Sequence, residues 1–177
     1  YLASTRLDEG DDGHVEVRKA VADVEERTEK LLGIGGARTP DSFHRELGNI
    51  IWNNCGMARN GKDLQGAIDR IPVLRDEFWQ NLKVTGTGES LNQTLEKAGR
   101  VADFMELGEL MCRDALARDE SCGCHYREEH VTEEGEAARN DADYQYVAAW
   151  EFTGDVSKPT LHKEALEFEY VKPVQRS

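Results

Sequence analysis

The sequence predicts a mainly α protein: an antiparallel helical bundle followed by an irregular segment and a small antiparallel β ribbon. Over residues 14–118, apolar side chains recur at steps of three and four, which is the spacing of one helical face. Short polar or glycine-containing segments separate these stretches, and helices joined by short turns pack against each other. From residue 119 the chain is acidic and loses this periodicity until two strand-like runs near its end. We therefore expect two parts, residues 1–118 and residues 119–177.

The first two predicted helices lie on either side of the stretch GIGGAR. Residues 14–32 should form the first helix, which ends where glycine can supply left-handed backbone. Its predicted apolar stripe consists of Val17, Val21, Val24, Thr28 and Leu31. The second helix follows Pro40, and either Asp41 or Ser42 can cap it. Its predicted apolar face consists of Phe43, Leu47, Ile50, Ile51 and Cys55.

Two longer helices complete the predicted bundle. The third starts at about Asp63, and Pro72 should kink it because proline removes a backbone donor. Ser90 and Gln93 have capping-box spacing at the start of a fourth helix that runs to about Arg118. The apolar face of the third helix is Leu64, Ala67, Ile68, Ile71, Leu74 and Phe78. That of the fourth helix is Leu91, Leu95, Ala98, Ala102, Met105, either Gly108 or Glu109, and Cys112.

The end of the chain predicts a two-stranded ribbon. Residues 144–152, YQYVAAWEF, are rich in aromatic and β-branched side chains, and residues 165–171, ALEFEYV, alternate apolar with acidic. An isolated hairpin is marginally stable in water, so this ribbon should lean on the bundle or on parts of a larger protein. The chain opens YLASTRLDEG without an initiator methionine, and we expect it to be a piece of a longer polypeptide.

The charge and composition argue against several functions. The formal net charge is −13, with 35 acidic against 22 basic residues, so the chain should repel nucleic acid and anionic lipid. No apolar run approaches the roughly 20 residues that cross a bilayer, and we expect no direct membrane insertion. Four cysteines in 177 residues are typical of reduced thiols in an intracellular, cytoplasmic protein.

The stretch DESCGCHYREEH, residues 119–130, raises the question of a metal site. Cys122, Cys124, His125 and His130 are zinc-ligand types, but one residue between the cysteines is closer than the usual two to four. CGCH also lacks the spacing of a haem attachment motif. Neither a redox thiol pair nor acid–base chemistry by the following REEH is favoured: no basic setting lowers a thiol pKa, and solvated charges are the simpler explanation of an acidic loop. GIGGAR lacks the preceding strand of a nucleotide site. The residues thus predict no catalytic, cofactor-binding or metal-binding side chains.

The order of longer phrases is more informative than any short motif. HRELGNIIWNNCGMARN, then KAGRVADFMELGELMCRDALARDESCGCHYREEHVTEEGEAARND, then YQYVAAWEF and KPTLHKEALEFEYVKPVQRS resemble the C-terminal region of the flavoprotein subunit of succinate dehydrogenase and fumarate reductase. The resemblance extends from about residue 40 to the end. The family phrase E-S-R-G-x-H-x-R corresponds here to Glu120 through Arg127, with Cys122 in place of the arginine.

This resemblance implies a spectrin-repeat-like bundle and a tail that packs against a flavin-binding domain outside this sequence. It implies that Ser121, Gly123, His125 and Arg127 form a packed turn that holds its own shape or contacts that domain. The family's parent enzyme interconverts succinate and fumarate with covalently bound FAD, and it passes electrons to or from iron–sulphur centres and quinone. The implied partners are the flavin-binding domain of the same chain and an iron–sulphur subunit. The implied location is the inner face of the cell membrane, reached through that complex.

Three alternatives remain open at this point. The matching domain of L-aspartate oxidase shares a helical C-terminus and a phrase like E-S-R-G-x-H. A free-standing metal-binding module would use Cys122, Cys124 and His130. A free-standing helical adaptor would need none of these residues.

Overall fold

A computed structural model describes residues 14–171 and residue 174 of the chain. The long helices are α1 (Val15–Gly33), α2 (Pro40–Asn54), α3 (Gly61–Asn81) and α4 (Gln93–Ala117). The short elements are β1 (Ala58–Arg59), β2 (Tyr126–Arg127), α5 (Asp141–Tyr144), β3 (Tyr146–Glu151) and β4 (Thr160–Ala165). The predicted mainly α fold with a small antiparallel sheet is confirmed.

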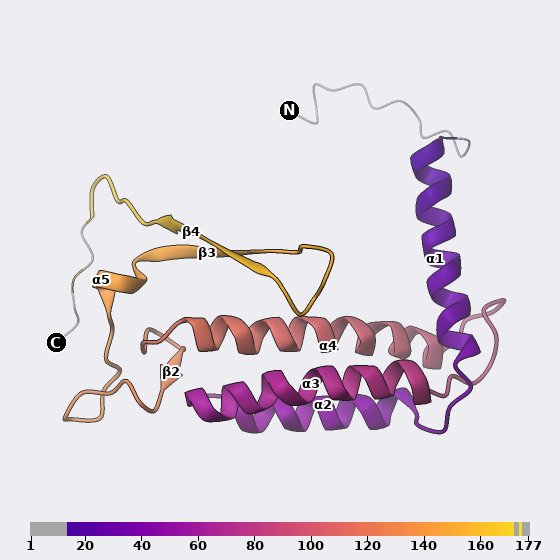
Figure 1. The fold of residues 1–177 in the computed structure, drawn as a ribbon, viewed down its shortest axis with the longest axis horizontal. Coiled ribbons are helices and arrows are strands. Elements are labelled where there is room, and N and C mark those ends of the chain that lie inside the picture. Colours follow the sequence, from indigo (N-terminus) through magenta and orange to yellow (C-terminus); the bar gives the residue numbers. More distant parts are fainter. Residues whose placement is uncertain (1–13, 172–173, 175–177) are drawn as a thin grey trace.

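The core lies between α2, α3 and α4, which are stacked side by side with alternating chain direction (Figure 1). Every apolar position predicted for α3 is buried. The rings of Phe43 and Phe78 meet edge to face at 5.2 Å between centroids, which joins α2 to α3. Gly108 lets α4 approach α2, because a Cβ there would lie 3.3 Å from the Ile51 side chain. These contacts bury most of the three faces that the periodicity predicts. Leu91 is the exception: it precedes α4, which begins at Gln93, and is 94% exposed.

The N-caps of α2 and α4 differ from the predicted ones. Thr39, rather than Asp41 or Ser42, caps α2: its side chain accepts from the Ser42 N–H, and Pro40 then takes the first helical position. Asn92 caps α4 in place of the Ser90 capping box. Its Oδ1 accepts from the backbone N–H groups of Thr94 and Leu95, while its Nδ2 bonds two carbonyls of the preceding loop. One asparagine thus fixes both the loop and the helix start.

Helix α1 departs most from the predicted bundle. Its first turns extend away from the other long helices, and only its C-terminal end packs against them (Figure 1). Of the predicted stripe only Leu31 is buried, whereas Val21 and Val24 are 51% and 66% exposed. Arg27 ties α1 to α4 through the Asp103 carboxylate at 2.5 Å. The stripe exists as predicted, but within the described residues no other element covers its N-terminal half.

The ribbon pairs β3 with β4 in antiparallel register, from Tyr146 opposite Ala165 to Glu151 opposite Thr160. The predicted second strand, 165–171, is therefore displaced: the pairing partner is TLHKEA, and the pairing ends at Ala165. Residues 152–159 connect the two strands and include Gly154, whose φ of 91° helps the chain to reverse before β4 begins at Thr160. Because Ala165 faces Tyr146, the first residue of β3, the acidic alternation after Ala165 continues past the start of β3, where no partner strand remains.

No helix among residues 14–171 has both the length and the hydropathy needed to traverse a bilayer.

Candidate functional site

The densest polar network outside the helices lies where the bundle meets the tail. We call residues 118–130 the junction; they connect the end of α4 to the irregular segment and lie beside β1 and the start of α3 (Figure 1). Strand β2 of the junction pairs in parallel with β1. The N–H of Glu128 donates to the carbonyl of Arg59 at 2.8 Å, which continues this pairing toward α3. Segments nearly 70 residues apart in sequence are thereby fixed together.

Ser121 closes the junction on itself. Its side chain is fully buried, its Oγ accepts from the Arg127 N–H at 2.8 Å, and the same hydroxyl donates to the Arg127 carbonyl at 3.1 Å. The Ser121 N–H donates to the carbonyl of Ala138, farther along the tail. A buried hydroxyl that both donates and accepts leaves no polar atom unpaired, which is how a turn is stabilised in a dry interior.

The loop that Ser121 and Arg127 close is a tight reverse turn. Cys122 and His125 exchange backbone hydrogen bonds of 2.9 and 3.1 Å. Gly123 at the tip has φ of 60°, a conformation that residues with a Cβ rarely adopt. Gly123 and Cys124 are exposed. The turn therefore presents its tip to the surroundings from a rigid, buried base.

His125 lies between two arginines. Its Nε2 is 2.8 Å from the Arg118 carbonyl and its Nδ1 is 2.9 Å from Nη1 of Arg59. A guanidinium can only donate and a carbonyl can only accept, so the imidazole is neutral with its hydrogen on Nε2. Burial, followed by the charges of Arg59, Arg127 and Arg118, lowers the pKa of His125, against the opposing effect of the Arg118 carbonyl. The residue acts here as a fixed linker.

Arg127 stabilises the C-terminal end of α4. Its side chain is 3% exposed, and Nη1 donates to the carbonyl of Ala115 at 3.2 Å. Unpaired carbonyls and the negative end of the helix dipole both favour a cation at this position. Asp119 at 3.1 Å and Glu129 at 3.2 Å balance the guanidinium charge. Arg127 therefore joins the end of one helix to the loop that follows it.

Glu129 makes the matching connection at the N-terminal end of α3. Its Oε1 accepts from the Gly61 N–H at 2.5 Å, beside the Asn60 cap of the same helix. Burial would raise the pKa of Glu129, but the Gly61 N–H and the Arg127 guanidinium outweigh it and hold the pKa at about 2. The junction thus carries a positive side chain at a helix C-terminus and a negative one at a helix N-terminus, as the two dipoles require.

Arg118 attaches the ribbon to the junction. Its guanidinium bonds the buried carboxylate of Glu120 at 2.6 Å and donates to the carbonyls of Tyr144 and Tyr146 at 3.3 and 3.2 Å. It also lies 5.1 Å from the centroid of the Tyr146 ring. The second oxygen of Glu120 accepts from the N–H of Asn140. Arg118 therefore attaches the start of the ribbon to the junction at the end of α4.

The residues of the alternative metal module are not grouped around one point. His130 bonds the Asp119 carboxylate at 2.7 Å, His125 is held by two arginine residues, and Cys124 is exposed at the turn tip. Within the part of the chain that the structure describes, no three or more His, Cys, Asp or Glu side chains are arranged to hold a metal ion.

The GIGGAR glycines do not form a cradle for a dinucleotide such as FAD. A Cβ on Gly36 would lie 2.1 Å from the backbone of Asn81, so this glycine serves the close crossing of two backbone segments. A helix, α1, precedes the stretch instead of a strand. This stretch therefore lacks the strand–loop–helix arrangement of a dinucleotide-binding motif.

The predicted residues Ser121, Gly123, His125 and Arg127 all lie in the junction. Arg127 reaches the Ala115 carbonyl of α4, Ser121 and His125 bond backbone groups of the junction itself, and Gly123 forms the tip. The sequence interpretation did not identify Arg59, the partner of His125, which lies 66 positions earlier. Arg59 lies in the stretch GMARN, and nothing in that stretch indicates an arginine that binds a histidine.

The fold and the junction together define a class: a helical domain whose main polar site joins a three-helix core to a β ribbon. The family model described as fumarate reductase flavoprotein C-terminal region matches residues 44–177, and the chain belongs to this family. The resemblance predicted from the sequence is thereby confirmed, as is the prediction of a C-terminal domain of the fumarate reductase and succinate dehydrogenase flavoprotein subunits.

Similarity to individual proteins supports the same family membership. One subunit of the fumarate reductase (CoM/CoB) of Methanothermobacter marburgensis is 32% identical over 113 residues, covering 64% of this chain and 20% of that protein. The Escherichia coli fumarate reductase flavoprotein subunit is 26% identical over 135 residues, covering 76% and 22% respectively. A solved quinol–fumarate reductase with menaquinol molecules shares the fold, with a TM-score of 0.77 at 23% identity over 93% of this chain and 28% of that chain. The chain thus spans about a fifth of the length of these curated relatives.

The L-aspartate oxidase of Vibrio cholerae is also similar, with 33% identity over 84 residues, but these cover only 46% of this chain and 14% of that protein.

Proposed function

We propose that this chain braces the flavin-binding domain of a succinate dehydrogenase or fumarate reductase flavoprotein subunit. The observation that carries the proposal is the shape of the junction: Gly123 and Cys124 are exposed at the tip of a turn whose base is buried and fully hydrogen-bonded. A rigid exposed tip loses little conformational entropy when another surface packs against it. In this proposal Gly123 contacts the flavin-binding domain, and Ser121, His125 and Arg127 position it.

The parent subunit, in this proposal, carries FAD and interconverts succinate and fumarate, exchanging electrons with an iron–sulphur subunit. FAD supplies the hydride acceptor or donor when bound, and residues outside this sequence hold it. The relatives that carry the word flavoprotein in their names are fumarate reductase and succinate dehydrogenase subunits, which supports the assignment. We place the complex at the inner face of the cell membrane, where quinone is available to it.

Two measurements test the isolated chain. The purified 177-residue protein should show no flavin absorbance band and no oxidation of succinate with a dye acceptor. A bound flavin together with succinate-dependent dye reduction would overturn the proposal that this region only braces the catalytic part.

A third measurement tests the contact itself. In the full-length subunit expressed from the parent gene, Cys124→Trp should place a bulky ring at the tip and lower flavin retention and the thermal midpoint of the holoprotein. Gln80→Trp adds the same ring at an exposed position in α3, away from the junction, and is the matched control. Equal retention of flavin in both variants and the wild type would show that the tip makes no such contact.

A second candidate is the corresponding domain of an L-aspartate oxidase, which the shorter similarity favours. The parent gene decides between the two. A neighbouring gene for an iron–sulphur subunit supports the dehydrogenase or reductase, whereas neighbouring genes for quinolinate synthesis support the oxidase.

A further inference from the structure

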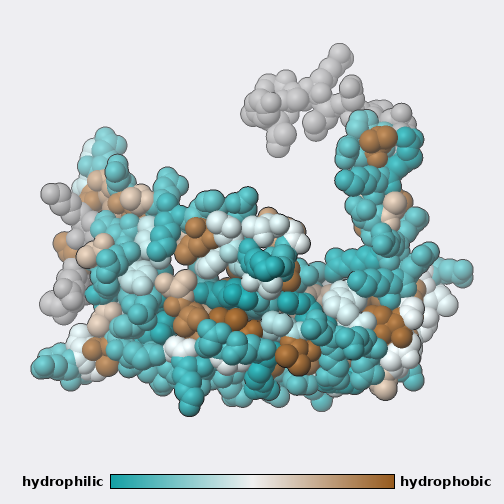
Figure 2. All heavy atoms as spheres, viewed as in Figure 1, coloured by the Kyte–Doolittle hydropathy of each residue, from teal (hydrophilic) through white to brown (hydrophobic). Residues whose placement is uncertain are grey.

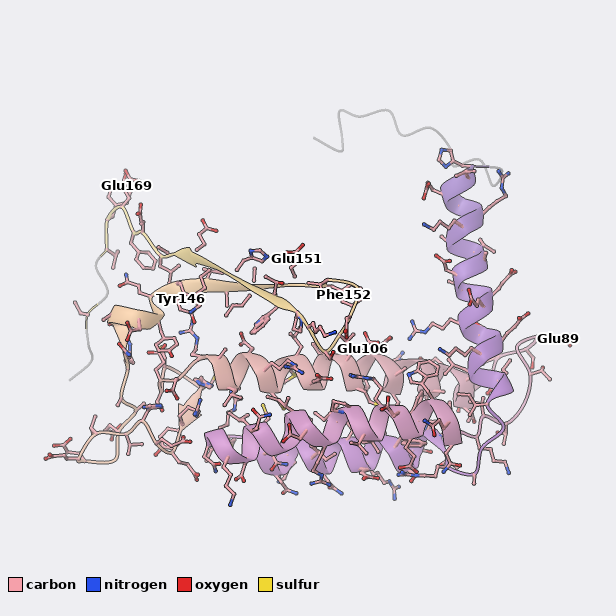
Figure 3. The ribbon with its side chains drawn as sticks, in the orientation of Figure 1. Glu89, Glu106, Tyr146, Glu151, Phe152 and Glu169 are labelled. Atoms are coloured by element: carbon pink, nitrogen blue, oxygen red, sulfur yellow. The ribbon has the colours of Figure 1, made fainter. Side chains whose placement is uncertain are left out.

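A groove lies between α4 and the β3–β4 ribbon, on the opposite side of α4 from the core. It encloses about 290 Å³, close to the lower limit of small-molecule sites, which begin at roughly 300 Å³. Figure 3 shows Glu106 on α4 facing the ribbon, with Glu151 at the last position of β3 and Phe152 directly after it. Its apolar lining comes from both elements: Leu107, Leu110, Trp150, Phe152, Val156 and Pro159. The groove thus has a helical floor and a ribbon wall.

One hydrogen bond joins the wall to the floor beside the groove. Nε1 of Trp150 donates to the Asp114 carboxylate on α4 at 2.8 Å, directly beside the groove. The segment 152–159 is ordered by its own contacts, since the Asp155 carboxylate accepts from the backbone and the hydroxyl of Ser157. The separation of floor and wall is therefore set by specific contacts.

The apolar lining continues onto the exposed surface of α4. Leu107 is 54% exposed and Phe152 68% exposed, and Phe104 and Met111 extend the same helical face by one turn in each direction. Figure 2 shows brown apolar side chains gathered along the α4 side below the ribbon. Contiguous exposed apolar surface with a polar rim is typical of a site that another molecule covers.

The rim of the groove is acidic. Asp103, Glu106 and Glu151 are the only charged residues among those that line it. In the described part of the chain, Asp103 pairs with Arg27 and Glu151 with His162, whereas Glu106 takes part in no recorded ion pair or hydrogen bond. Asp103 and Glu151 are themselves more than half exposed, so their pairs leave carboxylate oxygens facing water.

From this combination we infer that the groove binds a basic amphipathic segment of another polypeptide. One large apolar side chain of that segment would enter between Leu107 and Phe152, and its lysine or arginine residues would lie beside Glu106 and Glu151. The acidic rim complements a cation and repels an anionic ligand, while the apolar floor requires a hydrophobic anchor. The inference is independent of the proposed function, because it needs neither flavin nor the parent complex.

The test uses the 177-residue chain and two labelled probe peptides in a fluorescence anisotropy titration. One probe has leucine on one helical face and lysine on the other; its partner has glutamate in place of every lysine. We expect the lysine probe to bind, the glutamate probe not to bind, and the affinity for the lysine probe to fall as salt shortens the Debye length.

Matched variants locate the site. Glu106→Lys should weaken binding of the lysine probe by about tenfold or more, because it replaces attraction with repulsion in the groove. Leu107→Asp should weaken it by removing the anchor contact, and its half-exposed position leaves the fold intact, which circular dichroism can verify. Glu134→Lys makes the same change in charge on the exposed tail and should leave the affinity unchanged.

Several results would overturn the inference. The lysine probe could fail to bind, or both probes could bind equally well. Glu106→Lys and Glu134→Lys could also weaken binding equally, which would indicate attraction to the whole acidic surface and not to the groove. Quenching of Trp150 by menadione, an uncharged apolar ring compound, with no binding of the lysine probe would instead mark the groove as a small-molecule site. For this readout Trp52 and Trp79 are replaced by phenylalanine so that Trp150 alone reports.

Discussion

Nη1 of Arg75 on α3 lies 2.6 Å from Oε2 of Glu109 on α4, and the Glu109 side chain is 1% exposed. The other oxygen of this carboxylate accepts from Arg113, one turn farther along α4, at 2.7 Å. A carboxylate in this position has no access to water and depends on the two guanidinium groups for its hydrogen bonds. The network fixes the register of α3 against α4 within an otherwise apolar interface.

Replacement of Glu109 by alanine should therefore lower the free energy of unfolding by about 3–5 kcal/mol, the usual cost of breaking a buried pair from one side. A triple variant with Arg75→Met, Glu109→Leu and Arg113→Leu should recover most of this loss, since no charge then remains to be buried. Urea denaturation at neutral pH measures both. Glu96→Ala, which removes an exposed i,i+4 pair with Arg100, is the control, with an expected change below about 0.5 kcal/mol. Equal effects of Glu109→Ala and Glu96→Ala would contradict the role given to the network.

The start of α4 offers a direct comparison of two caps. Asn92→Ala removes the side chain that accepts from Thr94 and Leu95 N–H and should cost about 1 kcal/mol of stability. Ser90→Ala should cost close to nothing, because Ser90 is exposed and lies outside the helix start. Thermal unfolding of the two variants beside the wild type measures the difference. A larger loss for Ser90→Ala would favour the capping box that the sequence alone predicts.

The core of the bundle was predictable because it depends on local periodicity. Leu64, Ile71 and Phe78 recur at intervals of seven, which keeps them on one face of α3, and all three are fully buried. The same rule identified the stripe of α1 but not its environment, since periodicity shows which residues share a face and not whether another element covers it. Val24 satisfies the pattern and is still 66% exposed.

The junction was predictable only in part, and the reason is the range of its contacts. Ser121 and Arg127 are six positions apart, so a packed turn between them lies within reach of sequence reasoning. Arg59 and Glu129 act through partners 66 and 68 positions away, and no local pattern specifies such pairs. The second strand was misplaced for a related reason: alternation in 165–171 indicates a strand-like surface, but pairing with β3 is decided by the length of the connecting loop.

The two junction cysteines provide a test of the metal alternative. Cys122 is half-buried and Cys124 is exposed, and neither side chain has a recorded hydrogen bond within the described residues. The double variant Cys122→Ala, Cys124→Ala should therefore keep the circular dichroism spectrum and lose less than about 1 kcal/mol of stability, as expected of sites away from the core. Elemental analysis of the wild-type chain should find no stoichiometric zinc. Bound zinc together with unfolding of the double variant would restore the metal-binding module as the leading interpretation.

His125 should make the stability of the chain depend on pH. Burial and the neighbouring arginines lower the pKa of His125 in the folded state below its ordinary value of about 6.5, which the unfolded chain retains. At a pH between these two values the unfolded state binds more protons, so its free energy falls relative to that of the folded state. The contribution of His125 is therefore complete above the unfolded pKa and is lost as the pH falls through the folded one. Urea denaturation at about pH 7.5 and pH 5.5 should show lower stability at the acidic pH.

The His125→Gln variant separates this effect from the titration of the carboxylates. A glutamine amide can still donate to the Arg118 carbonyl but does not titrate, so the variant should lose less stability than the wild type between the two pH values. His162→Gln changes a histidine whose side chain is 58% exposed and whose partner is Glu151 in the ribbon; it should keep the wild-type pH dependence. If His125→Gln and His162→Gln show the same dependence as the wild type, His125 is not held neutral between Arg59 and Arg118. The imidazole would then accept a proton without breaking the junction.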